Sequence, residues 1–251
     1  MRSFFKHLVI FALFLLCYSS VSAQALHPKF VDIHKEFYGQ WPKTITFVQK
    51  TDMYRADTVF RTQTWYEAGI FPNLFRIDFG GPKEGNAVIY RGDSTYNFRK
   101  AKMLKANVDP NILVYLLGGM YFETADQVNQ KLKLEGFDLS KSYQSKWNNR
   151  DVEIFGTTQA DTTKSQLWYD AKNHYLVRMI QQKEKSRLEC HFKNHQKVGK
   201  IWHEDNVKIF VNNKLVQTEG YSDFKIDATL NPDFFNPAKF GSWHWLKWTE
   251  Q

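Results

Sequence analysis

The feature that most restricts the fold of this chain is a long succession of short strand-like segments separated by tight turns. They lie at 45–50, 58–66, 73–79, 87–90, 94–99, 143–147, 152–155, 166–169, 175–181, 187–192, 197–203, 207–211 and 215–224. Asparagine, which tolerates a positive φ, stands at several expected turns: Asn148-Asn149, Asn173 and Asn212-Asn213. Most segments have one apolar and one polar face, as antiparallel strands with one wetted face do. The pattern predicts a large antiparallel sheet.

Two amphipathic helices are also predicted. The first begins at Pro28, because proline suits the first position of a helix. The second begins with the capping-box sequence at 124–127. Val128 and Leu132 mark the buried side of this second helix, which we expect to end at Gly136.

A third helix interrupts the strands in the middle of the chain. Asp109-Pro110 is a favourable start, residues 112–117 are all apolar or aromatic, and Gly118-Gly119 is a stop signal. A helix that is apolar all round is expected to be covered on all sides. A large sheet that curls needs something to fill its concave face, and either this helix or a ligand can do so.

The N-terminus has the pattern of a secretory signal. Arg2 and Lys6 give a basic start, residues 8–18 are an uncharged apolar run, and Val21-Ser22-Ala23 offers small residues for cleavage. The run is too short to span a membrane. We therefore expect residues 1–23 to be removed and the protein to be exported. A lipoprotein signal at Cys17 is the alternative, although the residues before it are bulky.

Composition then excludes several classes of protein. Without residues 1–23 the net charge falls by two from +8, because the segment contains two basic and no acidic residues. The remaining basic residues are scattered, so no nucleic-acid partner is expected. Cys190 is then the only cysteine, and the fold must hold by core packing rather than by an internal disulfide. No later apolar run is long enough to cross a membrane.

Several segments, in order, resemble a known family, the periplasmic carriers of outer-membrane lipoproteins (LolA-like proteins). The similar segments are Phe47-Val48-Gln49-Lys50, Pro72-Asn73-Leu74-Phe75-Arg76, residues 88–98, residues 167–178 and Asp233-Phe234-Phe235-Asn236-Pro237. The similarity is most specific between residues 45 and 100 and covers most of the chain after the signal.

The resemblance implies a mainly β fold with helices (α+β): a curved, unclosed antiparallel half-barrel whose apolar concave face is covered by lid helices. Residues 24–251 would form a single LolA-like lipid-binding domain. The implied function is a non-enzymatic carrier or sensor of the outer-membrane lipoprotein-sorting type, which would be periplasmic, either free or associated with a membrane. Its ligands would be acyl chains of a lipid or lipoprotein, its partners inner- and outer-membrane proteins, and it would need no cofactor.

One position departs from the family pattern. The family has arginine immediately before Pro-Asn-Leu-Phe, where it is understood to hold the lid closed through hydrogen bonds to the lid backbone. This chain has Phe71 there, and a phenylalanine side chain makes no such hydrogen bonds. We expect Phe71 to add apolar area to the mouth of the cavity instead of acting as that latch.

The expected acyl-binding residues are the large apolar side chains of the early strands and the central helix. They are Phe47, Trp65, Phe71, Phe75, Ile77, Ile89, Tyr96, Phe98, Leu113, Leu116 and Leu117. Which side chains face inward depends on strand register, because a shift of one residue reverses the two faces.

Other chemistry is weakly indicated. His191 and His195 lie too far apart along a strand to share a metal ion, and Cys190 alternates with apolar residues as a buried thiol does. His203-Glu204-Asp205 is expected to be a solvated turn, and no nucleophile elbow accompanies it. An envelope protein-interaction domain with a self-filled core, and less readily a hydrolase, are the alternative functions. The tryptophan-rich end, 243–248, would pack on the barrel or contact a membrane or partner.

Overall fold

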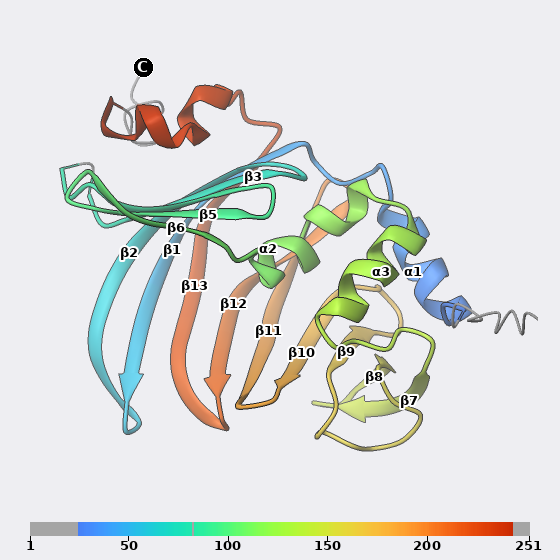
Figure 1. Ribbon diagram of the computed structural model, residues 1–251. Coiled ribbons are helices and arrows are strands. Elements are labelled where there is room, and N and C mark those ends of the chain that lie inside the picture. Colours follow the sequence, from blue (N-terminus) through green and yellow to red (C-terminus); the bar gives the residue numbers. More distant parts are fainter. Residues whose placement is uncertain (1–24, 82, 243–251) are drawn as a thin grey trace, which may run out of the picture.

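The computed structural model describes residues 25–81 and 83–242 (Figure 1). The expected signal at 1–23 and the tryptophan-rich segment at 243–248 lie outside the described residues. The strands are β1 Thr44–Arg55, β2 Thr58–Ile70, β3 Leu74–Phe79, β4 Asn86–Arg91, β5 Ser94–Arg99, β6 Lys102–Val108, β7 Ser142–Trp147, β8 Arg150–Phe155, β9 Gln166–Asp170, β10 Leu176–Lys183, β11 Ser186–Val198, β12 Ile201–Val211 and β13 Lys214–Ile226. The α-helices are α1 Pro28–Phe37, α2 Ile112–Leu116 and α3 Ala125–Leu134, with short 3₁₀ helices η1 Gly119–Phe122, η2 Pro232–Phe235 and η3 Pro237–Ser242.

The strands form one antiparallel sheet that does not close into a barrel. Its 13 strands lie in the order β6-β5-β4-β3-β2-β1-β13-β12-β11-β10-β9-β8-β7. All neighbours are consecutive in the chain except β1 and β13, which pair at positions such as Gln49 with Tyr221 and Thr51 with Glu219. This pairing joins the two halves of the chain, so β12 and β13 lie in the middle of the sheet. The predicted mainly β, unclosed half-barrel is confirmed.

The three α-helices lie on the concave side of the curved sheet (Figure 1). Residues of α1 and α3 pack in one apolar core with the inward side chains of β8–β12. Phe30, Val128 and Leu132 are fully buried in this core, and Cys190 and Phe192 contribute to it from β11. The helices therefore fill the concave face over that part of the sheet.

The C-terminal helices η2 and η3 lie on the other side of the sheet, over β3–β6 (Figure 1). Phe234, Phe235 and Phe240 pack there against Ala68, Ala87, Ile89 and Phe98. The buried guanidinium of Arg76 donates to the Phe234 carbonyl over 2.8 Å and forms an ion pair of 2.7 Å with Asp78. Arg76 therefore ties the C-terminal segment to β3.

Most local predictions are confirmed. The first helix begins at Pro28, and the capping box formed by Thr124 and Gln127 begins α3. Both asparagine pairs have positive φ angles, whereas at the third turn the positive φ belongs to His174 rather than Asn173.

Other local predictions were wrong. Residues 197–203 are not one strand, because the chain turns after Val198 and the segment is divided between β11 and β12. Strand β6 was not predicted. Its side chains are mostly exposed, so its sequence lacks the alternation of apolar and polar residues from which a strand is predicted.

The central helix also differs from expectation. It is only five residues long and is capped by Asn111, whose Oδ1 accepts from the amides of Leu113 and Val114. Of its residues only Leu116 is fully buried. The expectation that it is covered on all sides was therefore wrong, and its other apolar side chains border open space.

In the described part of the chain, the helices are all too short or too polar to cross a lipid bilayer.

Candidate functional site

A cavity of about 310 Å³ lies on the part of the concave face that the α1–α3 core leaves open. Its walls come from α2 and from strands β1–β4, β12 and β13, and most lining residues are aliphatic or aromatic. This volume is at the lower end of the range for small-molecule sites. We call this space the main cavity.

Seven of the predicted site residues line the main cavity: Phe47, Trp65, Phe71, Phe75, Ile77, Leu113 and Leu117. Ile89 and Phe98 instead pack under the C-terminal segment, with Tyr96 against the same cluster. The register explains the difference, because Ile77 pairs with Val88, so Val88 faces the cavity and the next residue, Ile89, faces away. Leu116 packs in the core formed with α1 and α3.

Sequence reasoning missed the contribution of β12 and β13. Val207 and Ile209 of β12, and Tyr221 and Phe224 of β13, line the main cavity. Alternation along the strand was a usable signal for Val207 and Ile209 but not for Tyr221 and Phe224, because the register of β13 against β1 shifts between these two residues. What the sequence did not reveal was that these strands lie beside β1, since that pairing joins segments about 170 residues apart in the chain.

A second cavity, of about 350 Å³, lies on the other side of α2. Phe75, Tyr90, Asn111 and Val114 line both cavities. Helix α2 is thus a partition between two spaces. Its incomplete burial makes it one of the less firmly held elements on the concave face.

Phe71, which directly follows β2, contacts the segment α2–η1 (residues 112–122). It is 2% exposed, and its ring lies parallel to that of Phe122 with centroids 6.0 Å apart. Gly118 makes this packing possible, because a Cβ there would lie 2.3 Å from the Phe71 ring. The residue that replaces the family arginine therefore contacts the covering segment through van der Waals packing.

Three buried carboxyl groups line the otherwise apolar main cavity. Glu67 of β2, Glu204 of β12 and Glu219 of β13 are 4%, 7% and 8% exposed. Burial raises the pKa of all three, that of Glu204 to about 8, and repulsion by Glu219 contributes to the rise for Glu67 and Glu204. The expectation that residues 203–205 form a solvated turn was wrong, because they lie within β12.

The polar atoms of these residues differ in their partners. Tyr221 Oη and Gln217 Nε2 each donate to Glu219 over 2.5 Å. In contrast, the Oε1 atom of Glu67 is buried and has no hydrogen-bond partner, and the same holds for the indole nitrogen of Trp41 at the same cavity. The cavity wall therefore holds an unused acceptor and an unused donor.

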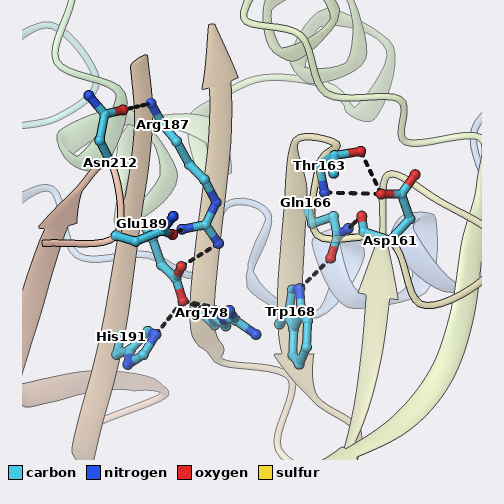
Figure 2. Close-up of polar contacts among 10 residues, drawn as sticks. Asp161, Thr163, Gln166, Trp168, Arg178, Arg187, Glu189, His191 and Asn212 are labelled. Atoms are coloured by element: carbon cyan, nitrogen blue, oxygen red, sulfur yellow. Dashed lines mark hydrogen bonds and ion pairs between the residues drawn. The ribbon is translucent and has the colours of Figure 1, made fainter.

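A network of polar side chains on β10 and β11 is drawn in Figure 2. It lies on the face of the sheet opposite to the helices, because Glu189 and His191 flank Cys190, which packs in the concave core. Figure 2 shows Arg178, Arg187 and His191 converging on Glu189, with Arg178 Nε donating to Oε1 over 2.7 Å and His191 Nε2 lying 2.5 Å from it. Burial opposes ionisation, but these donors outweigh it and lower the pKa of Glu189 to about 2. The network holds neighbouring strands together and faces no cavity described here.

The described residues contain no group of three or more His, Cys, Asp or Glu side chains that could hold a metal ion. His191 takes part in the network on Glu189, while His195 stacks on Tyr175 with centroids 3.8 Å apart. Cys190 is fully buried, and burial raises the pKa of its thiol. Its environment is that of an unreactive core thiol.

Comparisons with known proteins identify the fold. No family model and no curated protein sequence matches the chain. A DUF1329 family protein from Desulfovibrio piger has a TM-score of 0.58 at 12% identity, over 84% of this chain and 97% of that one. A putative outer-membrane lipoprotein-sorting protein domain from Vibrio parahaemolyticus has a TM-score of 0.58 at 15% identity, with the same coverage.

A LolA superfamily protein from Nitrosomonas europaea has a TM-score of 0.55 at 11% identity, over 84% of this chain and 98% of that one. Identities this low establish the fold alone. The fold of the chain is LolA-like, as the sequence resemblance implied.

Proposed function

We propose that this protein is an exported, non-enzymatic carrier or sensor that holds an acyl chain of a lipid or lipoprotein in the main cavity. The observation that carries the proposal is the apolar main cavity between α2 and the concave face of a LolA-like sheet. One structural neighbour is a putative outer-membrane lipoprotein-sorting protein domain. Lipoprotein sorting is the kind of process in which such a carrier would act.

The lining supplies the binding energy that an acyl chain needs. Each methylene group removed from water contributes about 0.8 kcal/mol. Phe47, Phe75, Ile77 and Leu113 border the cavity with apolar surface and require no matching polar group. A chain of several methylenes would therefore bind with useful affinity through its hydrocarbon part.

Access to the cavity would depend on helix α2. This helix separates the main cavity from the second one and is only partly buried. Displacement of α2 would join the two spaces and lengthen the site. Phe71 and Gly118 would then act as the contact that opens when a chain enters or leaves.

The remaining parts of the proposal follow from the sequence. Residues 1–23 would be cleaved on export, residues 24–251 would form one lipid-binding domain, and the protein would act in the periplasm at the inner and outer membranes. Donor and acceptor proteins would be membrane-associated. An interaction domain whose own helices fill its core is the competing function, favoured by the packing of α1 and α3 on the sheet.

Fluorescence quenching tests the proposal. Trp41, Trp65 and Trp202 line the main cavity, whereas Trp147 and Trp168 lie in a separate cluster. Bromine quenches nearby indoles, so 12-bromododecanol is expected to quench the fluorescence of the protein saturably. Three variants each keep one of these three lining tryptophans and have phenylalanine in place of the other two. Comparing their quenching shows which indole lies nearest the bromine.

A matched pair of variants supplies the control. Leu113→Arg places a charge in the cavity wall and is expected to weaken quenching at least tenfold. Leu104→Arg makes the same change at a leucine on β6 that is 65% exposed, and should bind like the parent. Unsaturable quenching, or equal quenching in both variants, would count against an acyl site and favour the interaction domain.

A further inference from the structure

The main cavity has a charge character opposite to that of the whole chain. The protein carries 34 Lys and Arg against 26 Asp and Glu. Yet among the described residues that line the main cavity there is no lysine or arginine, while Glu67, Glu204 and Glu219 all belong to it. The only histidine among these described lining residues is His203, which lies against the ring of Phe224 with centroids 4.0 Å apart.

Packing alone does not account for these acids. A buried carboxyl group is costly unless hydrogen bonds or a charge compensate it. Hydrogen bonds from Tyr221 and Gln217 compensate Glu219. Glu67 lines the cavity and is only 4% exposed, which means that it is 96% buried. Its Oε1 atom has no hydrogen-bond partner. A bound group that donates hydrogen bonds is the missing element.

The nature of that group follows from charge. Mutual repulsion raises the pKa of Glu67 through both Glu204 and Glu219, after the larger effect of burial. A cation beside Glu67 would favour the ionised form of this carboxyl, which burial and repulsion oppose, and its N–H groups would supply the missing donors. Among the described residues no group of three or more acidic, histidine or cysteine side chains could hold a metal ion, so the cation proposed here is one that donates hydrogen bonds rather than a metal ion.

We propose that Glu67, with Glu204 and Glu219, binds the protonated amine of an amphiphile whose hydrocarbon chain occupies the apolar part of the main cavity. This inference rests on the proposed acyl-binding function and adds the headgroup chemistry to it. An ammonium group has three donors and no acceptor, which matches a cluster of acceptors. Long-range attraction does not explain such a preference, since the protein itself is positively charged.

Competition among ligands of one chain length tests the proposal. Dodecylamine, dodecanol and dodecanoate, each below its critical micelle concentration in 0.15 M salt, would displace 12-bromododecanol from the protein. We expect dodecylamine to bind at least tenfold more tightly than dodecanol, and dodecanoate to bind most weakly. Equal affinity for amine and alcohol, or a preference for dodecanoate, would overturn the amine assignment while leaving the acyl site in place.

Two variants locate the headgroup. Glu67→Gln keeps the shape of the side chain and is expected to lower the affinity for dodecylamine far more than the affinity for dodecanol, so that most of the preference for the amine is lost. Glu153→Gln is the matched control, because Glu153 is 5% exposed, lies on β8 away from the cavity and accepts from Ser142. If the preference survives Glu67→Gln, Glu67 is not the amine site. If none of the three ligands binds, the acyl-binding function fails and the amine site with it.

Discussion

At the scale of single residues, the packing of Phe71 on Gly118 replaces a polar latch. Gly118 has an extended backbone, so it is needed for space rather than for an unusual φ angle. In Gly118→Ala the new methyl group would meet the Phe71 ring at 2.3 Å. We expect a loss of about 1–3 kcal/mol in unfolding free energy, as for other overpacked sites, measured by urea denaturation.

Two further variants separate this contact from a general effect of alanine. Gly81→Ala is the control, because a Cβ at Gly81 meets nothing within 4 Å. Phe71→Leu in the Gly118→Ala background should recover part of the lost stability by making room. A Gly118→Ala protein as stable as the parent would show that Phe71 does not hold the α2–η1 segment.

Glu189 gives the protein a sensitivity to acid. Its pKa is lowered from 4.5 to about 2 in the folded state, so its contribution to stability is complete above the unfolded value and is lost as the pH falls toward 2. We expect the unfolding free energy of the parent to fall more steeply below pH 4.5 than that of Glu189→Gln. Parallel pH profiles for the two proteins would contradict the network in Figure 2.

Glu204 has the opposite effect. Its pKa is raised from 4.5 to about 8 by burial, so the favourable protonated state is complete below pH 4.5 and is lost as the pH rises through about 8. Stability is therefore expected to decline between these values in the parent and to vary less in Glu204→Gln. Urea midpoints at pH 5, 7 and 9 measure the difference; a midpoint that rises with pH only in the parent would refute the assignment.

At the scale of elements, α2 is the part of the concave face best suited to move. Only Leu116 of its residues is fully buried, whereas β1 and β13 are paired along most of their length. We expect the amides of residues 113–117 to exchange with solvent faster than those of β1. Saturation with dodecanol should slow their exchange, and exchange that is unaffected by the ligand would mean that α2 does not cover it.

The C-terminal helices depend on Arg76. Its guanidinium lies 4.0 Å from the centroid of the Phe234 ring and pairs with Asp78, which is 2% exposed. Arg76→Met removes one partner of a buried carboxylate, a change that costs about 3–5 kcal/mol. The double variant with Asp78→Leu should be more stable than the single one. Equal stability of parent and Arg76→Met would show that this pair does not anchor η2.

At the scale of the whole molecule, local signals in the sequence were sufficient for some elements and not for others. The capping box at Thr124 and the apolar spacing of Val128 and Leu132 defined α3 because both act within a few residues. The strands of the hairpins were found for the same reason. Strand β6 was missed since its mostly exposed side chains carry no periodic apolar pattern.

The site was predictable only in part, because its composition depends on register and on distant pairing. The sequence predicted that Ile89 faces the cavity, but its neighbour Val88 does so instead. An error of one residue along a strand is enough to exchange the two faces. Glu204 and Glu219 became cavity residues through the pairing of β13 with β1. Local sequence patterns do not encode that pairing, so the buried acids were not foreseen.

The proposed function requires a hydrocarbon chain to occupy the main cavity, and a crystal structure with 12-bromododecanol tests this directly. Bromine scatters anomalously, so its position does not depend on interpreting weak density for the chain. We predict one bromine peak inside the main cavity, within the walls formed by α2, β1 and β2. Bromine found only on the outer surface of the sheet, with the cavity unchanged, would contradict the account.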